Sequence, residues 1–160
     1  MVKLYRSIYN IKCVTGILFN HESQYRNKNF ITQKIVTGAI ECSKDKSKKI
    51  SVGNLNIFRD WGWAEEYIEA AHLMLKTESL KDQIICTGEL NSLEELIKIT
   101  FEKLDLNYKN HIISEKKLFR KTDIKYSYGD PKPIENDLKW KANLHMQDVI
   151  EKLLEYQLKK

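Results

Sequence analysis

The most constraining feature of the sequence is a short apolar run that is followed at once by four polar residues. Residues 13–19 read Cys-Val-Thr-Gly-Ile-Leu-Phe, with almost no polar side chain on either face. A strand of this kind is normally buried on both sides, as in a parallel sheet that helices cover. The tetrad Asn20-His21-Glu22-Ser23 then ends the run. We therefore expect polar side chains beyond the carboxyl end of a parallel strand, where open α/β sheets bind ligands.

The rest of the chain alternates between expected helices and expected short strands. We expect strands at 50–52, 83–86 and 111–114 and helices at 5–10, at 30–42, after Gly129-Asp130-Pro131 and at the C-terminus. Two further helices have N-terminal signals, Asp60 as an N-cap and Ser92 with Glu95 as a capping box. The apolar face of the helix after Asp60 is predicted to hold Ala64, Tyr67, Ile68, Ala71 and Leu75. The alternation, with no internal repeat and no linker, predicts one α/β unit.

Composition narrows the class of protein. The chain has 160 residues, 27 Lys plus Arg against 22 Asp plus Glu, and three Cys in no CxxC pair. The length is that of one domain. The odd number of cysteines and the lack of a CxxC pair favour reduced structural thiols over disulfides or a metal site. No apolar run is long enough for a membrane span or a signal peptide, so we expect a soluble, cytoplasmic protein. The lysines at 44–49 have no interleaved aromatic residues, so binding of nucleic acid is not expected.

Three polar groups at the ends of expected elements point to one kind of ligand. Glycine permits close backbone approach, an asparagine amide matches a nucleobase edge, and Arg and Lys neutralise a diphosphate. A nucleotide diphosphate would use all of these properties. The three groups are the tetrad beginning at Asn20, the pair Thr32 and Lys34, and Gly53-Asn54 followed by Arg59-Asp60-Trp61.

These residues stand in strings that resemble a known family. The strings are GILFNHES at 16–23, FITQKI at 30–35, GNL at 53–55, RDWG at 59–62, YIEA at 67–70 and TGE at 87–89. Together they resemble the C-terminal half of the GDP-mannose 4,6-dehydratase family, in the extended short-chain dehydrogenase/reductase group. The similarity runs from about Tyr5 to the C-terminal helix. It implies an α/β fold with part of a Rossmann-like sheet and a small substrate-binding lobe, and it makes residues 1–160 a single substrate-binding portion.

The resemblance also implies roles for individual residues. Asn20 matches a contact to the sugar nucleotide, and Thr32 and Lys34 match contacts on its nucleotide side. Gly53 and Asn54 fall where the group binds the base, and Arg59 and Arg120 match two arginines on the diphosphate. Asp123 replaces a glutamate that would bind a ribose hydroxyl, and because Asp is one methylene shorter, ribose recognition is an open question. The implied substrate is GDP-mannose or a related GDP-sugar.

The chain departs from the family by what it lacks. Family members carry a glycine-rich turn for NADP and a Tyr-x-x-x-Lys pair ahead of this region. This sequence has no such glycine-rich turn, and no Tyr-x-x-x-Lys pair precedes the strand at 13–19. We therefore expect the chain alone to bind no NADP and to be inactive in converting GDP-mannose to GDP-4-dehydro-6-deoxy-mannose. The alternatives are a non-catalytic GDP-sugar-binding module and a dehydratase fragment acting on a GDP-manno-heptose. Without the N-terminal half or a homo-oligomeric partner, the strand at 13–19 is expected to expose an apolar edge.

Overall fold

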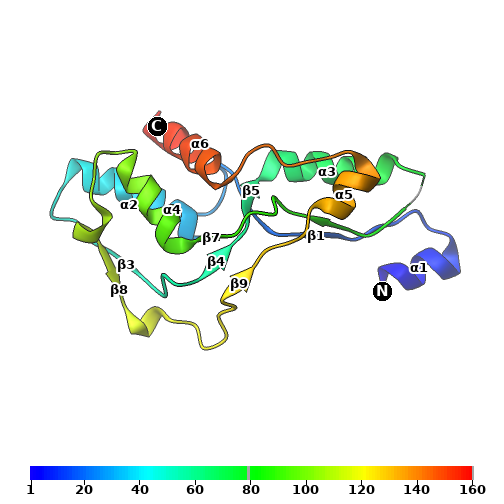
Figure 1. The fold of residues 1–160 in the computed structure, drawn as a ribbon, viewed down its shortest axis with the longest axis horizontal. Coiled ribbons are helices and arrows are strands. Elements are labelled where there is room, and N and C mark those ends of the chain that lie inside the picture. The colour runs from blue at the N-terminus through cyan, green and yellow to red at the C-terminus, as the bar shows by residue number, and fades with distance from the viewer. Residues whose placement is uncertain (79, 160) are drawn as a thin grey trace.

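The computed structural model describes residues 1–78 and 80–159, which form an elongated molecule of short strands flanked by helices (Figure 1). The helices are α1 Val2–Tyr9, α2 Ile31–Lys44, α3 Ala64–Lys76, α4 Leu93–Glu102, α5 Lys132–Leu138 and α6 Met146–Leu158, with 3-10 turns η1 Tyr108–Asn110 and η2 Lys116–Leu118. The strands are β1 Gly16–Leu18, β2 Asn20–Glu22, β3 Ile50–Val52, β4 Phe58–Arg59, β5 Trp61–Trp63, β6 Gln83–Ile85, β7 Asn91–Ser92, β8 Ile112–Ser114 and β9 Tyr126–Ser127. No helix among the described residues is both long enough and apolar enough to cross a membrane.

The strands pair mostly in parallel, as the alternating sequence predicts. β1 pairs with β6, β2 with β5 and β3 with β8, all in parallel. β4 is the centre of a three-stranded sheet, antiparallel to β7 and parallel to β9. Parallel pairs need crossover connections, which the helices supply here. The mixed α/β architecture predicted from the sequence is therefore confirmed.

The strand expected over residues 13–19 is shorter and more exposed than predicted. Only Gly16–Leu18 forms β1, and the polar residues that were expected to end it form a second strand, β2, in another sheet. Ile17 is 53% exposed and Leu18 38% exposed, where burial on both sides was expected. The physical reason is that, within residues 1–78 and 80–159, β6 is the only strand beside β1. The exposed apolar edge expected for the lone chain is therefore present.

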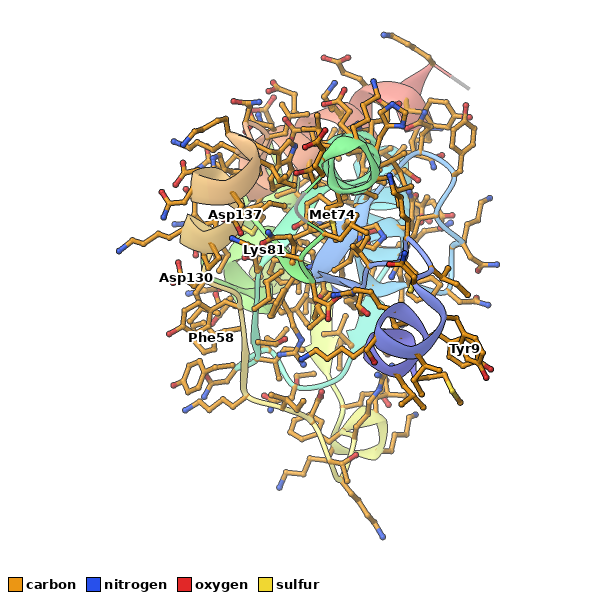
Figure 2. The ribbon with its side chains drawn as sticks, turned by 90° about the vertical axis from the view of Figure 1, so that its right-hand side faces the viewer. Tyr9, Phe58, Met74, Lys81, Asp130 and Asp137 are labelled. Carbon is orange, nitrogen blue, oxygen red and sulfur yellow. The ribbon has the colours of Figure 1, made fainter. Side chains whose placement is uncertain are left out.

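Two apolar clusters hold the molecule together. The larger one gathers side chains of α2, α4 and α6 with β3 and β5, and it includes Trp61 and Phe101. The smaller one lies under α3 and α5 at the other end of Figure 1, and Met74 in Figure 2 belongs to it. The Lys81 Nζ lies 2.7 Å from the Asp137 carboxylate of α5, and this ion pair attaches the segment before β6 to that helix.

Asp60 is not the N-cap that the sequence suggests. α3 begins at Ala64, and its N-cap residue is Trp63. The Asp60 side chain is fully buried, and it accepts hydrogen bonds from the Thr87 N–H at 3.0 Å, the Thr87 hydroxyl at 2.8 Å and the Gly88 N–H at 2.8 Å. A carboxylate in the interior is stable only with such partners. Asp60 thus joins the β4–β5 turn to the end of β6.

The buried face of α3 is also displaced from the predicted one. Tyr67, Ala70 and Met74 are buried, whereas Ile68 is 66% exposed and Leu75 is 63% exposed. The three buried positions are spaced three and four residues apart, so the helical period was right and its phase was wrong. The reason is Tyr67, whose ring lies against Gly62: a Cβ there would lie 2.4 Å from Tyr67 Cε2. Close packing of that ring fixes the rotation of the helix.

Other sequence predictions are confirmed. The Ser92 hydroxyl accepts a hydrogen bond from the Glu95 N–H at 3.0 Å and so caps α4, which is the Ser92 half of the expected capping box. The helix start at Gly129-Asp130-Pro131 appears as α5, with Pro131 as N-cap residue. In the C-terminal helix α6, the five apolar residues expected on its inner face are all buried: Met146, Val149, Ile150, Leu153 and Leu154.

Replacing Asp60 tests its place in the fold. Asp60→Asn keeps the shape but turns an amide NH2 toward groups that need an acceptor. Because hydrogen bonds to a charged group contribute about 1.5–3 kcal/mol each, we expect a loss of about 3 kcal/mol in the free energy of unfolding, measured by urea denaturation. Asp105→Asn is the control, since its left-handed backbone (φ 56°) suits Asn. Equal stability of the two variants would contradict the role of Asp60.

Candidate functional site

The larger of two neighbouring pockets, about 570 Å³, lies where four segments meet. Its walls come from the start of β2, the N-terminal turn of α2, the residues after β3 together with β4, and the loop between η2 and β9. β2 and β3 contribute at their ends or just beyond them. The pocket therefore stands near strand ends in an α/β fold, where the sequence predicted a ligand.

The structure brings seven of the eight predicted site residues to this pocket. They come from distant parts of the chain, between positions 20 and 123, and they line one wall or another. These residues are Asn20, Lys34, Gly53, Asn54, Arg59, Arg120 and Asp123. Thr32 is the exception, because its side chain is buried beside Glu22 and is not part of the lining.

The charge of the pocket is strongly positive. Four cationic side chains, Arg26, Lys34, Arg59 and Arg120, face a single carboxylate, Asp123, among the residues that line it. A concave site lined by one sign of charge concentrates ligands of the other sign. The pocket is therefore suited to an anion with several negative oxygens, such as a diphosphate.

Arg59 is held in place by the loop that carries Asp123. Its Nη1 donates to the Phe58 carbonyl at 2.8 Å and to the Ile124 carbonyl at 2.7 Å. Its Nη2 lies 3.2 Å from the Asp123 carboxylate, and both side chains are largely shielded from solvent, with 15% and 21% exposed. Asp123, which the resemblance places at a ribose, is thus engaged with Arg59.

Lys34 lies beside the N-terminal end of α2. Its ammonium donates to the Ser51 carbonyl at 2.6 Å, which fixes it against β3. Phe30, the N-cap residue, provides no side-chain cap, so the free N–H groups of the first turn add partial positive charge to the same wall. Lys34 and the helix end together favour a phosphate group there.

Gly53 lets the loop around η2 approach the pocket closely. A Cβ at this position would lie 2.8 Å from the Leu118 carbonyl oxygen, too close for any other residue without movement. Next to it, the Asn54 side-chain oxygen accepts a hydrogen bond from the Asn56 N–H at 2.9 Å, which makes a tight local turn. At Gly53 and Asn54, a closely approaching backbone and an amide side chain thus lie next to each other in the pocket wall.

A second pocket of about 430 Å³ lies on the β1 side and shares Asn20 and Arg26 with the first. It is lined by the exposed strand residues, by His21 and by Ser127. The His21 ring lies 5.1 Å, centroid to centroid, from the Tyr67 ring. The shared residues make the two pockets adjacent, so a ligand longer than one pocket can extend into the other.

Two buried groups, Tyr67 and Cys86, keep their protons at physiological pH. Burial, with the nearby Asp60 charge, raises the pKa of Tyr67 well above its usual range and the pKa of Cys86 to about 12. Neither is therefore an ionised nucleophile or base at pH 7. Within residues 1–78 and 80–159, no group of three or more His, Cys, Asp or Glu side chains could hold a metal ion.

Sequence reasoning missed part of the lining. Arg26 and Phe30 belong to the larger pocket but were not predicted as site residues, and Trp61 stood in one of the three polar groups without a role of its own. The signal for Arg26 was its position six residues after Asn20, in the polar segment beyond the strand. For Trp61 no signal in the sequence separated a pocket wall from the core, and its side chain serves both.

Comparison with known proteins agrees with the resemblance seen in the sequence. Residues 1–153 match the family model described as GDP-mannose 4,6 dehydratase. GDP-mannose 4,6 dehydratase 1 of Arabidopsis thaliana is 33% identical over 154 residues, which cover 96% of this chain and 43% of that protein. The GDP-mannose 4,6 dehydratase of Homo sapiens is 30% identical, covering 94% and 45%. The chain thus spans less than half the length of these relatives.

Solved structures show the same fold at lower identity. The dTDP-glucose 4,6-dehydratase of Bacillus anthracis, in complex with NAD, superposes with a TM-score of 0.85 at 16% identity, over 99% of this chain and 49% of that one. RMD from Pseudomonas aeruginosa, complexed with NADPH, gives 0.82 at 15% identity, over 99% and 53%. These identities support the fold alone. The part of the fold that this chain forms is about half of theirs.

Proposed function

The chain belongs to the GDP-mannose 4,6 dehydratase family, and from that premise we propose that it supplies the GDP-sugar-binding part of such an enzyme. The observation that carries the proposal is the convergence of seven separately predicted residues on one pocket with four cations. The names of the relatives indicate GDP-mannose as the substrate. The positive charge of the pocket fits the diphosphate that every GDP-sugar contains.

The parts of a GDP-sugar can be assigned to walls of the pocket. Arg59 and Arg120 hold the diphosphate, helped by Lys34 and the N-terminal end of α2. Gly53 and Asn54 receive the base, where an amide matches a nucleobase edge. Asn20 lines both pockets, and this supports a position of the sugar on the β1 side.

A nicotinamide cofactor belongs to the reaction of the intact family, and structural neighbours bind NAD or NADPH. When bound, such a cofactor supplies hydride chemistry at the sugar. The residues of this chain do not fit a whole dinucleotide, because its six glycines never stand in a GxxGxxG turn and no Tyr-x-x-x-Lys pair precedes β1. We therefore propose binding without turnover for the chain alone. Turnover of GDP-mannose by the purified chain would contradict that.

Titration with GDP tests the diphosphate assignment. We expect Arg59→Gln and Arg120→Gln each to weaken GDP binding about tenfold, or about 1.4 kcal/mol, measured by isothermal titration calorimetry. Each loses a charge-assisted hydrogen bond to phosphate. Lys132→Gln is the control, a cation of α5 outside the pocket lining. The assignment fails if GDP binds all four proteins equally, and the proposed function fails if it binds none of them.

The role of Asp123 has its own test, because its carboxylate is engaged with Arg59. We propose that Asp123 orients the Arg59 side chain and does not bind a ribose hydroxyl. GDP and 2′,3′-dideoxy-GDP should then bind the unmodified chain equally. Asp123→Asn should weaken both nucleotides by the same factor, about threefold to tenfold. A preference for GDP that Asp123→Asn removes would show instead that this residue binds a ribose hydroxyl.

We further propose that the open edge of β1 receives the remaining half of such an enzyme. In the part of the chain that the structure describes, β1 pairs with one strand only, and apolar side chains of α1 and β1 are exposed around it, including Ile8 at 61% and Tyr9 at 64%. Figure 2 shows Tyr9 at the outer edge of α1. Solved neighbours continue the fold beyond the region they share with this chain. A parallel strand with an apolar flank fits this edge.

Without that partner, the chain should associate with itself through this face. We expect an average mass in analytical ultracentrifugation that rises with concentration, and Ile17→Lys should return it toward the 18.9 kDa monomer. Ile113→Lys is the matched control, an exposed isoleucine on β8, at the other end of the molecule. A monomer at all concentrations, or equal effects of the two changes, would contradict the proposal.

A further inference from the structure

α3 carries a second apolar face that stays exposed to solvent. The residues of this face are spaced three and four positions apart, and the sequence predicts them on the inner side of the helix. In the structure Ile68 is 66% exposed and Leu75 is 63% exposed, whereas other residues form the buried face of α3. This second face, the α3 stripe, consists of Ala64, Ile68, Ala71 and Leu75.

The α3 stripe lies on the flank of α3 that is turned away from α5. With 3.6 residues per turn, the stripe stands about 100° around the helix from the buried face, and Glu66 stands on the opposite flank. Glu66 accepts hydrogen bonds from the Asn143 N–H at 3.0 Å and the Leu144 N–H at 3.1 Å, between α5 and α6. α5 is attached to β6, since Asp137 accepts from the Gln83 amide at 2.8 Å, and Figure 2 shows it to the left of α3. The α3 stripe is therefore on the side of the open edge of β1.

The order of side chains in the α3 stripe fits a second copy of the same helix. Small and large residues alternate along it. In an antiparallel pair of α3 helices centred between positions 69 and 70, Ala64 faces Leu75 of the other copy and Ile68 faces Ala71 of the other copy. Each large side chain then meets a small one, so the helices can approach to the usual distance of about 8–10 Å. A two-fold axis repeats both contacts.

The charges beside the α3 stripe match the same antiparallel arrangement. The first half of α3 exposes Glu65 and Glu69, and its last turn exposes Lys76. In the antiparallel pair, each Glu65 lies beside Lys76 of the other copy, whereas parallel helices would bring like charges together. Within residues 1–78 and 80–159, neither Glu65 nor Lys76 has an ion-pair partner, although Glu65 accepts a hydrogen bond from the Trp63 indole N–H at 3.2 Å. Both charges are therefore available to a second copy.

We propose that the α3 stripe is a dimer surface, on which two copies of this chain pair their α3 helices antiparallel across a two-fold axis. The stripe and the open edge of β1 lie on the same side of the molecule, so both take part in the self-association of the lone chain. The inference rests on the proposed function for that self-association and does not depend on any ligand. It adds a second surface and fixes the orientation of the two copies.

Analytical ultracentrifugation of the purified chain tests the surface. We expect Ile68→Glu and Leu75→Glu each to weaken self-association about tenfold or more, because each places a carboxylate against an apolar side chain of the other copy. Leu158→Glu is the matched control, an exposed leucine of α6, and should leave the association unchanged. At a concentration where the chain is monomeric, the midpoint of urea unfolding should be the same in all three variants, because the changed side chains are exposed.

Exchanging charges tests the antiparallel orientation. Glu65→Lys and Lys76→Glu each place like charges together at both ends of the helix pair, so each variant should self-associate about fivefold more weakly. An equimolar mixture of the two variants should recover most of the lost affinity, because every rim contact in the mixed pair again joins opposite charges. A mixture that associates no more tightly than the separate variants would overturn the orientation.

The outcomes separate this inference from the proposals for β1 and for GDP. If Ile17→Lys dissociates the chain and the changes at Ile68 and Leu75 do not, the inference fails. If the changes on α3 dissociate the chain and Ile17→Lys does not, the inference stands and the proposal for the β1 edge fails. A monomer at all concentrations overturns both. GDP binding is measured separately on the same proteins, and its absence overturns only the proposed binding function.

Discussion

The buried carboxylate of Asp60 is the interaction on which the arrangement of the pocket depends. It lies between β4 and β5, and its three hydrogen bonds come from Thr87 and Gly88, just beyond the end of β6. The residues on either side of Asp60 in the sequence lie in different environments. Arg59 on one side lines the pocket, and Trp61 on the other is buried in the larger cluster. By fixing the residue between them, Asp60 sets where the cation stands relative to the core.

The position of Asp60 also separates two kinds of surface. The larger cluster, with α2, α4 and α6, supports the cationic pocket and is covered by helices. The smaller cluster packs α3 and α5 against β6, and the outer edge of β1, the strand paired with β6, remains exposed. A binding site needs rigid walls, and the larger cluster provides them. The open side presents apolar side chains, which suits contact with more protein rather than with water.

The sequence predicted elements and site residues better than it predicted environments. Period and cap signals are local, so the helix starts at Ser92 and Pro131 could be found from neighbouring residues alone. Seven residues of the larger pocket were named in advance because they match strings of a family, although they are far apart in the chain. Asp60 was misassigned because its partners, Thr87 and Gly88, lie 27 and 28 residues away, and no local pattern reveals them. In the sequence, an Asp shortly before a helix looks the same whether its side chain caps that helix or accepts hydrogen bonds from a distant segment.

The same limit applies to charge. Net charge and motif position predict a cationic site, but they do not show which groups offset the repulsion between neighbouring cations. Here three of the cations have partners within the protein: Lys34 donates to a carbonyl of β3, Arg59 donates to two carbonyls and Asp123, and Arg26 forms an ion pair with Glu22 at 3.5 Å. These acceptors and the ion-pair partner lower the repulsion between the cations. Side chains already held in position lose less conformational entropy on binding, so more of the attraction to a diphosphate appears as affinity. The partners therefore belong to the pocket as much as the cations do, although the sequence named Asp123 only as a ribose contact and Glu22 only as a member of the polar tetrad.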